Sequence, residues 1–200
     1  LTGNRTSGLK AFWIAMRTLF RCACLCLSGN MTHTAQDYES MLMAIQSDPR
    51  YQSNLDWGRP RNGHPEGAIR AHIAELEQNL RRLGHKLTDL EIARLRVLIH
   101  VHDTFKPDAA EGVAILHPRS HASLAKAFLG EFCNDPQMLE IVQRHDEPYA
   151  LWLQQRSGRP VNELRWNNLL EAITDWTVFL AFLIVDGCTR GKSGEPVRWY

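Results

Sequence analysis

The chain has 200 residues, enough for one domain with a full-sized core or for one domain and a short extension. Its 23 basic and 22 acidic residues nearly cancel, so the charge indicates no nucleic acid or other polyelectrolyte as a partner. The 9 histidines are many for this length, and all but one lie between residues 64 and 145. The cysteines are odd in number and include no C-x-x-C pair, which favours reduced thiols and a cytoplasmic protein.

Residues 1–30 do not have the pattern of a folded domain. Positions 11–27 are fairly apolar and follow Arg5 and Lys10, an order of charged and apolar residues that is also typical of a signal peptide. Arg17 and Arg21 interrupt the apolar run, so no stretch here is long enough to span a bilayer. We expect residues 1–30 to be an extension outside the fold, either disordered or not native, with a membrane-associated leader as the alternative. The domain is expected at residues 31–200.

Apolar residues at helical spacing run through residues 31–200 and predict an all-α fold. We expect helices over 35–47, from 65 to the Gly84-His85 stop, over 88–102, from Ser120, from Asp135 and over about 162–185. Loops are expected at 48–63, 107–118 and 155–160. Thr88-x-x-Glu91 forms a capping box at the start of the third helix. The last helix is apolar nearly all round from position 176, which is typical of a buried central helix.

Ionisable side chains stand at the ends or on the inner faces of these helices. A lone inward histidine is more often a hydrogen-bonded core residue, and a His-Asp pair at a helix end can bond to the backbone. A whole set on different helices instead favours a metal site in the core of the bundle, since imidazole and carboxylate together suit divalent ions. The set consists of His72, His102, Asp103, His121, His145 and Asp186.

Several neighbours of this set have other expected roles. His100 is two residues from His102 and points to the opposite side of the helix, so it is left out of the site. Asp175 lies on roughly the same helix face as Asp186 and is a candidate for supporting it. Asp146 can either replace or support His145.

The order H…HD…H…H…D resembles the HD-domain superfamily of metal-dependent phosphohydrolases over about residues 31–200. The stretch from His102-Asp103 to Lys106 is similar to the HD-x-x-K signature of that family. The segment 64–67 (H-P-E-G) followed by His72 resembles the opening H-P-E-G…H of some members, and 186–187 resembles their closing D-G. Phe105 replaces the glycine that is common before the signature lysine, which leaves the shape of the substrate entrance open.

The resemblance implies a single HD-type helical bundle that binds one or two divalent ions, chosen from Mn, Fe, Mg, Co, Ni and Zn. It implies a first ion bound by His72, His102, Asp103 and Asp186, and a second ion bound by His121 and His145 with Asp103 as the bridge. The expected function is the hydrolysis of a small phosphate ester, such as a nucleotide, by metal-activated water.

Roles in catalysis and substrate binding follow from this expectation. Asp103 and Lys106 are the catalytic candidates, and Lys106 also neutralises phosphate charge together with Lys192 and Arg190. Alternatively, Lys192 and Arg190 belong to an ordinary solvated basic tail. His117 is a substrate-side candidate, and either His117 or His64 can protonate the leaving oxygen.

Two other functions fit the same residues. One is an HD-fold diiron oxygenase, and the other is a non-catalytic ligand-binding or protein-interaction domain that keeps the metal ligands but has lost turnover. The expected partner is a small phosphorylated substrate, such as a nucleotide, with no nucleic acid and no membrane, and a homo-oligomer is possible.

Overall fold

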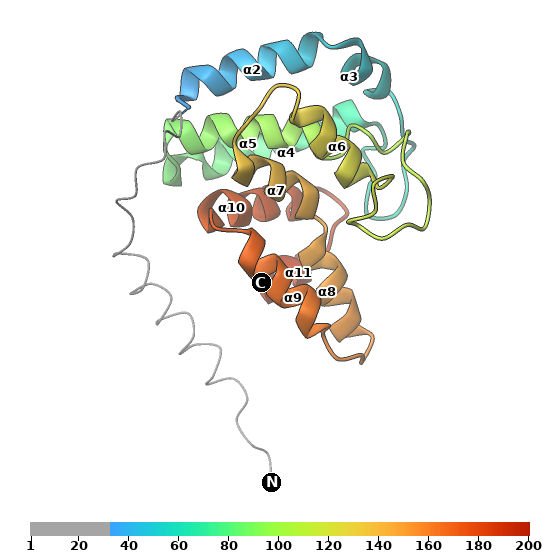
Figure 1. Ribbon diagram of the computed structural model, residues 1–200. Helices are drawn as coiled ribbons and strands as arrows, with labels where there is room; N and C mark the ends of the chain where they lie inside the picture. Colours follow the sequence, from blue (N-terminus) through green and yellow to red (C-terminus); the bar gives the residue numbers. More distant parts are fainter. Residues whose placement is uncertain (1–32) are drawn as a thin grey trace, which may run out of the picture. The chain divides into compact units, whose positions relative to one another are not determined.

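The computed structural model describes residues 33–200, so the expected extension over residues 1–30 lies outside the described residues. Helices make up most of the described chain (Figure 1), and only an isolated bridge between Arg61 and His64 has β-type pairing among these residues. The prediction of an all-α fold is therefore confirmed. The elements are α2 (Ala35–Ser47), α3 (Pro49–Asn54), α4 (Ile69–Leu83), the 3-10 helix η1 (Gly84–Lys86), α5 (Asp89–Val101), α6 (His121–Leu129), α7 (Pro136–Arg144), α8 (Glu147–Arg156), α9 (Glu163–Ala172), α10 (Trp176–Gly187) and α11 (Glu195–Trp199).

Helix α5 lies at the centre and contacts α2, α4, α7 and α10. It begins with the predicted capping box, in which Thr88 Oγ1 accepts from the Glu91 N–H at 3.3 Å and Glu91 Oε2 accepts from the Thr88 N–H at 2.7 Å. These bonds satisfy two N–H groups that have no partner within the helix. The last helical residue is Val101, so the predicted His102-Asp103 pair follows directly at the end of this central helix.

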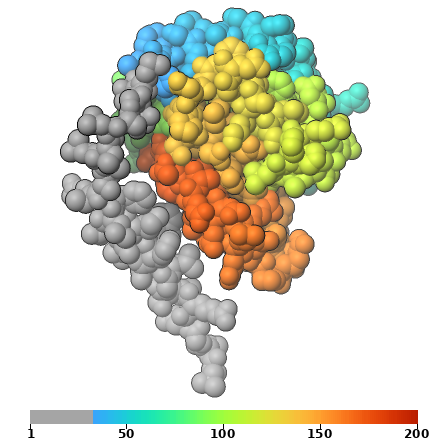
Figure 2. All heavy atoms as spheres, in the orientation of Figure 1, coloured from blue at the N-terminus to red at the C-terminus, as the bar shows by residue number. Residues whose placement is uncertain are grey.

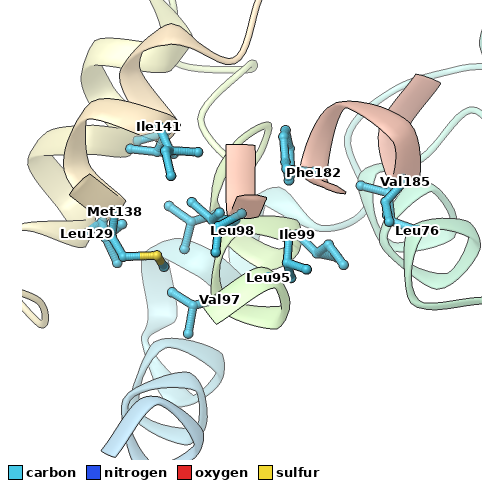
Figure 3. Packing of buried hydrophobic residues seen from close by; sticks show 14 of the residues in the cluster. Leu76, Leu95, Val97, Leu98, Ile99, Leu129, Met138, Ile141, Phe182 and Val185 are labelled. Carbon is cyan, nitrogen blue, oxygen red and sulfur yellow. The ribbon is translucent and has the colours of Figure 1, made fainter. Parts of the chain in front are cut away.

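The hydrophobic core forms around α5 (Figure 3). Leu95 and Leu98 of α5 are fully buried. Met138 of α7 lies on one side of them, and Phe182 of α10 lies on the other. On the face shown in Figure 2, the blue and cyan residues of α2 and α3 lie beside the green and yellow segment that includes α6 and α7, and the orange residues of α8 and α9 lie below it.

Two expectations for the first half of the domain were wrong. The expected loop at 48–63 contains α3, which Asp48 caps by accepting from the Arg50 N–H at 2.8 Å and which starts with Pro49. The next helix starts at Ile69 rather than at 65, because the preceding residues fold into turns. Gly67 has φ of +75° there, and a Cβ would lie 2.7 Å from Pro60 Cδ, so the turn requires glycine.

The expected single helix over 162–185 is divided into α9 and α10, which are bent by 116° at their break. Gln137 of α7 stabilises the break, because its Oε1 accepts from the Thr174 N–H at 2.8 Å and its Nε2 donates to the Ala172 carbonyl at 3.2 Å. Asp175 then caps α10 by accepting from the Val178 N–H at 3.2 Å. Among residues 33–200, no single helix is long and apolar enough to cross a membrane, although α9 and α10 pass that test as a bent pair.

Arg94 of α5 joins the starts of two helices. It pairs with Asp135, which caps α7, at 3.1 Å, and with Asp175, which caps α10. Tyr38 of α2 donates to the same Asp135 oxygen at 2.6 Å. The Arg94 side chain is only 12% exposed, so this network lies largely outside bulk water. It fixes the N-terminal ends of α7 and α10 against α5.

We predict that Arg94→Met lowers the free energy of unfolding by about 3 kcal/mol, because two carboxylates lose the cation that compensates their burial. Urea denaturation followed by circular dichroism measures this change. The matched control is Arg50→Met, which removes the exposed pairs with Asp48 and Glu131 and is expected to cost much less. Equal losses in the two variants would contradict the role of Arg94.

Candidate metal centre

The histidine and aspartate side chains that the sequence singles out come from five helices and gather around the end of α5. His72 lies on α4, and His102 and Asp103 directly follow α5. His121 is the first residue of α6, and its position is fixed by Ser120, whose hydroxyl accepts from the Ser123 N–H at 3.1 Å. The remaining two are His145, which ends α7, and Asp186, which lies in the last turn of α10.

The first group of potential ligands consists of His72, His102 and Asp186, whose ligand atoms lie within 4.8 Å of one another. His72 Nε2 is 3.0 Å from Asp186 Oδ1 and 3.8 Å from Asp103 Oδ2. His102 Nε2 is 3.4 Å from the same Asp103 oxygen. Metal–ligand bonds of about 2.1 Å place the ligands of one ion roughly 3–4 Å apart, so this spacing fits a common cation.

The second group consists of Asp103, His121 and His145. The Nε2 atoms of His121 and His145 are 3.3 Å apart, and they lie 3.6 and 3.7 Å from Asp103 Oδ1. Asp146 Oδ2 is a further oxygen beside this group, 3.2 Å from His121 Nε2 and 3.7 Å from His145 Nε2. Asp103 thus turns Oδ2 to the first group and Oδ1 to the second.

The hydrogen bonds of His102 determine which of its ring nitrogens is free. Its Nδ1 lies 3.1 Å from the Ile99 carbonyl and 3.3 Å from the Leu98 carbonyl, so Nδ1 carries the proton and donates to the backbone. Nε2 then presents a lone pair to the Asp103 carboxylate. Among the described residues, buried Nε2 atoms of both His102 and His72 lack any hydrogen-bond partner. Buried polar atoms without partners are costly, and a cation between these groups would remove that cost.

The electrostatics of the two groups differ. Burial disfavours the charged form of Asp103, but His102 and Lys106 outweigh it and hold the pKa of Asp103 well below its usual range. Burial lowers the pKa of His102, which keeps its ring neutral. Burial also opposes protonation of His145, yet Asp146 and Asp103 outweigh it and raise the pKa of His145 to about 9. A cation in the second group would therefore compete with a proton on His145.

Glu66 lies behind the first group. Its Oε1 is 3.0 Å from Nδ1 of both His64 and His72, and it is hydrogen-bonded to His64. The Glu66 side chain is only 2% exposed, and its second oxygen has no partner among the described residues. A carboxylate behind a ligand histidine orients the ring and makes the other nitrogen a better ligand. The sequence analysis placed Glu66 in the H-P-E-G segment and in the helix expected from 65, and it missed this contact.

A cavity of about 440 Å³ opens over the two groups. His102, Asp103, His145 and Asp186 lie in its wall, together with Lys106 and Lys192. Lys106 Nζ is 2.5 Å from Asp103 Oδ2, and Lys192 Nζ is 2.7 Å from Asp186 Oδ1. Gly187 allows α11 to close one side of the cavity, because a Cβ at this position would overlap Val197 of α11. The cavity has the size of a site for a small molecule.

Of the other residues predicted near the substrate, His117 and Arg190 lie outside the cavity wall and His64 lies in it. His117 is exposed on the loop before α6 and is not part of the cavity wall. Arg190 is also outside the cavity and pairs with Glu75 of α4 at 2.6 Å. His64 lines the cavity.

Two neighbours of the predicted ligands are also away from the centre. Asp175 caps the opposite end of α10 from Asp186, so the expectation that it supports Asp186 was wrong. His100 lies on the other side of α5, as expected, where its Nδ1 is 2.6 Å from the Tyr51 hydroxyl.

The chain matches no family model, no curated protein and no solved structure. What the site can bind is therefore inferred from its geometry alone, and this geometry includes clusters of histidine and aspartate that could hold a metal ion.

We predict that Glu66→Gln weakens the binding of Mn²⁺ to the first group about tenfold, because a neutral amide supports the His72 ring less strongly than a carboxylate. Isothermal titration calorimetry measures the affinity, and circular dichroism checks the fold. Glu75→Gln is the matched control on α4, since Glu75 contacts Arg190 away from the cavity. Wild-type affinity in Glu66→Gln would show that Glu66 does not support this ligand.

Proposed function

We propose that this chain is a phosphohydrolase of the HD-domain type, which uses one or two divalent ions to hydrolyse a small phosphate ester. The observation that carries the proposal is the position of Asp103 between the two ligand groups, with one carboxylate oxygen toward each. This arrangement matches the order and the bridging role that the resemblance to the HD superfamily implies. Buried His72 and His102 nitrogens without partners support a cation in the first group.

The proposed ligands lie in or directly beside helices α4, α5, α6, α7 and α10. The first ion would be held by His72, His102, Asp103 and Asp186, and the second by Asp103, His121 and His145 with Asp146 beside them. A mixed set of imidazole and carboxylate suits Mn, Fe, Co, Ni or Zn better than Mg, which prefers oxygen ligands. When bound, such ions lower the pKa of a water molecule and neutralise charge on phosphoryl oxygens.

The lysines at the cavity support phosphate chemistry over the other candidate functions. Lys106 and Lys192 each pair with a ligand carboxylate and face the same cavity. Nearby carboxylates raise the pKa of Lys106, so it stays charged although burial opposes this. A cation on the carboxylates would weaken these pairs and leave both ammonium groups available for the oxygens of a phosphate.

We predict about two divalent ions per wild-type chain and about one in His121→Ala, because this variant removes a ligand of the second group only. Elemental analysis of protein purified without chelator measures the content. His117→Ala is the matched control, since His117 is exposed and outside the cavity wall. One ion in both wild type and His121→Ala would reduce the centre to a mononuclear site. No ion in either, even after Mn or Fe is added, would contradict the proposal.

We predict that Lys106→Met lowers kcat/KM for phosphate esters about a hundredfold while the metal content is unchanged, because a positive group facing the phosphate is lost. Steady-state release of inorganic phosphate from the metal-loaded enzyme measures this effect. Lys126→Met is the control, since Lys126 pairs with Glu140 and does not line the cavity. If Lys106→Met lost metal in proportion to its loss of activity, Lys106 would instead be a residue that positions Asp103 for metal binding. Iron-dependent consumption of O₂ without phosphate release would favour the oxygenase alternative.

A further inference from the structure

The cavity over the candidate metal centre has a second wall of different chemistry. Helix α8 presents Tyr149, Trp152, Leu153 and Arg156 to it, at the spacing of one helix face. Helix α8 begins directly after His145 and Asp146, so no loop separates this wall from the candidate metal ligands in the sequence. The lining of the cavity therefore combines ionic side chains with aromatic ones.

The aromatic residues of α8 are not part of the main hydrophobic core. Trp152 is buried, yet within the described residues it does not belong to the core cluster around α5. Tyr149 is 48% exposed and Leu153 is 41% exposed, although both are large and lie at the cavity. Exposed apolar side chains that gather at a concave site are typical of a ligand-binding surface. Core packing therefore does not account for this wall.

The arrangement of the rings favours a flat partner. The ring centres of Tyr149 and Trp152 are 5.5 Å apart with an interplanar angle of 33°. The Arg156 guanidinium lies 5.0 Å from the centre of the Trp152 ring and pairs with Glu195 of α11 at 3.2 Å. Planar aromatic and guanidinium faces stack on flat rings. A saturated ring of the same carbon count cannot approach such faces as closely.

We propose that the cavity takes a phosphate ester whose alcohol portion carries a flat aromatic ring, with the ring against Tyr149 and Trp152 and the phosphate toward Lys106 and Lys192. This inference rests on the proposed function for the position of the phosphate, and it adds the substrate class. The cavity volume of about 440 Å³ suits an ester of this size. Tyr149 and Trp152 are specificity-determining residues in this arrangement.

Two non-hydrolysable ligands test the inference by binding alone. Benzylphosphonate and cyclohexylmethylphosphonate have the same charge and carbon count and differ in the flatness of the ring. Calorimetry on the metal-loaded full chain is expected to show about fivefold tighter binding of benzylphosphonate, the size of a favourable aromatic pair. In Tyr149→Leu and in Trp152→Leu this preference is expected to fall to nearly one. Tyr149 is half-exposed, so Tyr149→Leu keeps the test valid if Trp152→Leu does not fold.

Trp57→Leu is the control, since Trp57 is an exposed aromatic residue outside the cavity wall and its loss is expected to leave the preference unchanged. Equal affinity for the two phosphonates, or no binding of either, would overturn the inference. So would a preference that survives in Tyr149→Leu.

Turnover separates this inference from the proposed function. Benzyl phosphate and methyl phosphate leave as alcohols of similar acidity, so a higher kcat/KM for benzyl phosphate reports recognition of the ring. Hydrolysis of both esters at equal kcat/KM would overturn the aromatic specificity and leave the phosphohydrolase proposal intact. Tighter binding of benzylphosphonate without hydrolysis of either ester would support the aromatic wall and contradict the phosphohydrolase.

Discussion

A buried carboxylate surrounded by imidazoles is the constraint on which the arrangement of helix ends depends. Asp103 is 6% exposed and remains charged, so its burial requires compensating positive charge from its neighbours. Lys106 supplies one charge to Oδ2 and protonated His145 faces Oδ1. Oδ2 also faces the first group, where the buried Nε2 atoms of His72 and His102 have no hydrogen-bond partner among the described residues, so a cation could bind there.

The same helices that carry the ligands are fixed at their other ends. Helix α7 starts at the Asp135 cap and ends at His145, and α10 starts at the Asp175 cap and has Asp186 in its last turn. Arg94 pairs with both caps, so one residue of α5 sets the positions of two helices whose far ends reach the centre. A ligand set held in this way by rigid elements would need little rearrangement to bind an ion, which would favour affinity. The stability of the network and the geometry of the site are thus physically coupled.

The sequence predicted those features that local signals specify. The capping box at Thr88, the all-α class and the six ligand candidates could be read from short patterns, because caps and helical periodicity depend on neighbouring residues. The break before Asp175 could not be predicted, since its backbone groups are satisfied by Gln137 of another helix. Glu66 was misread for a similar reason. Its role depends on contact with His72, and the distance between them follows from the turn that Gly67 permits.

If the proposed function holds, the position of α8 would link binding of the phosphate to recognition of the rest of the substrate. The chain reaches the metal centre at His145, and after Asp146 it continues directly into the helix that carries Tyr149 and Trp152. A shift of α8 relative to α7 would move the aromatic wall together with Asp146, the residue that precedes α8 and lies beside the second ligand group. Changes of side chain on the exposed face of α8 leave the ligands in place, whereas changes at the joint between the two helices alter both. In the proposed enzyme, substrate specificity would therefore vary on this helix without loss of the candidate metal ligands, provided that the joint after α7 is preserved.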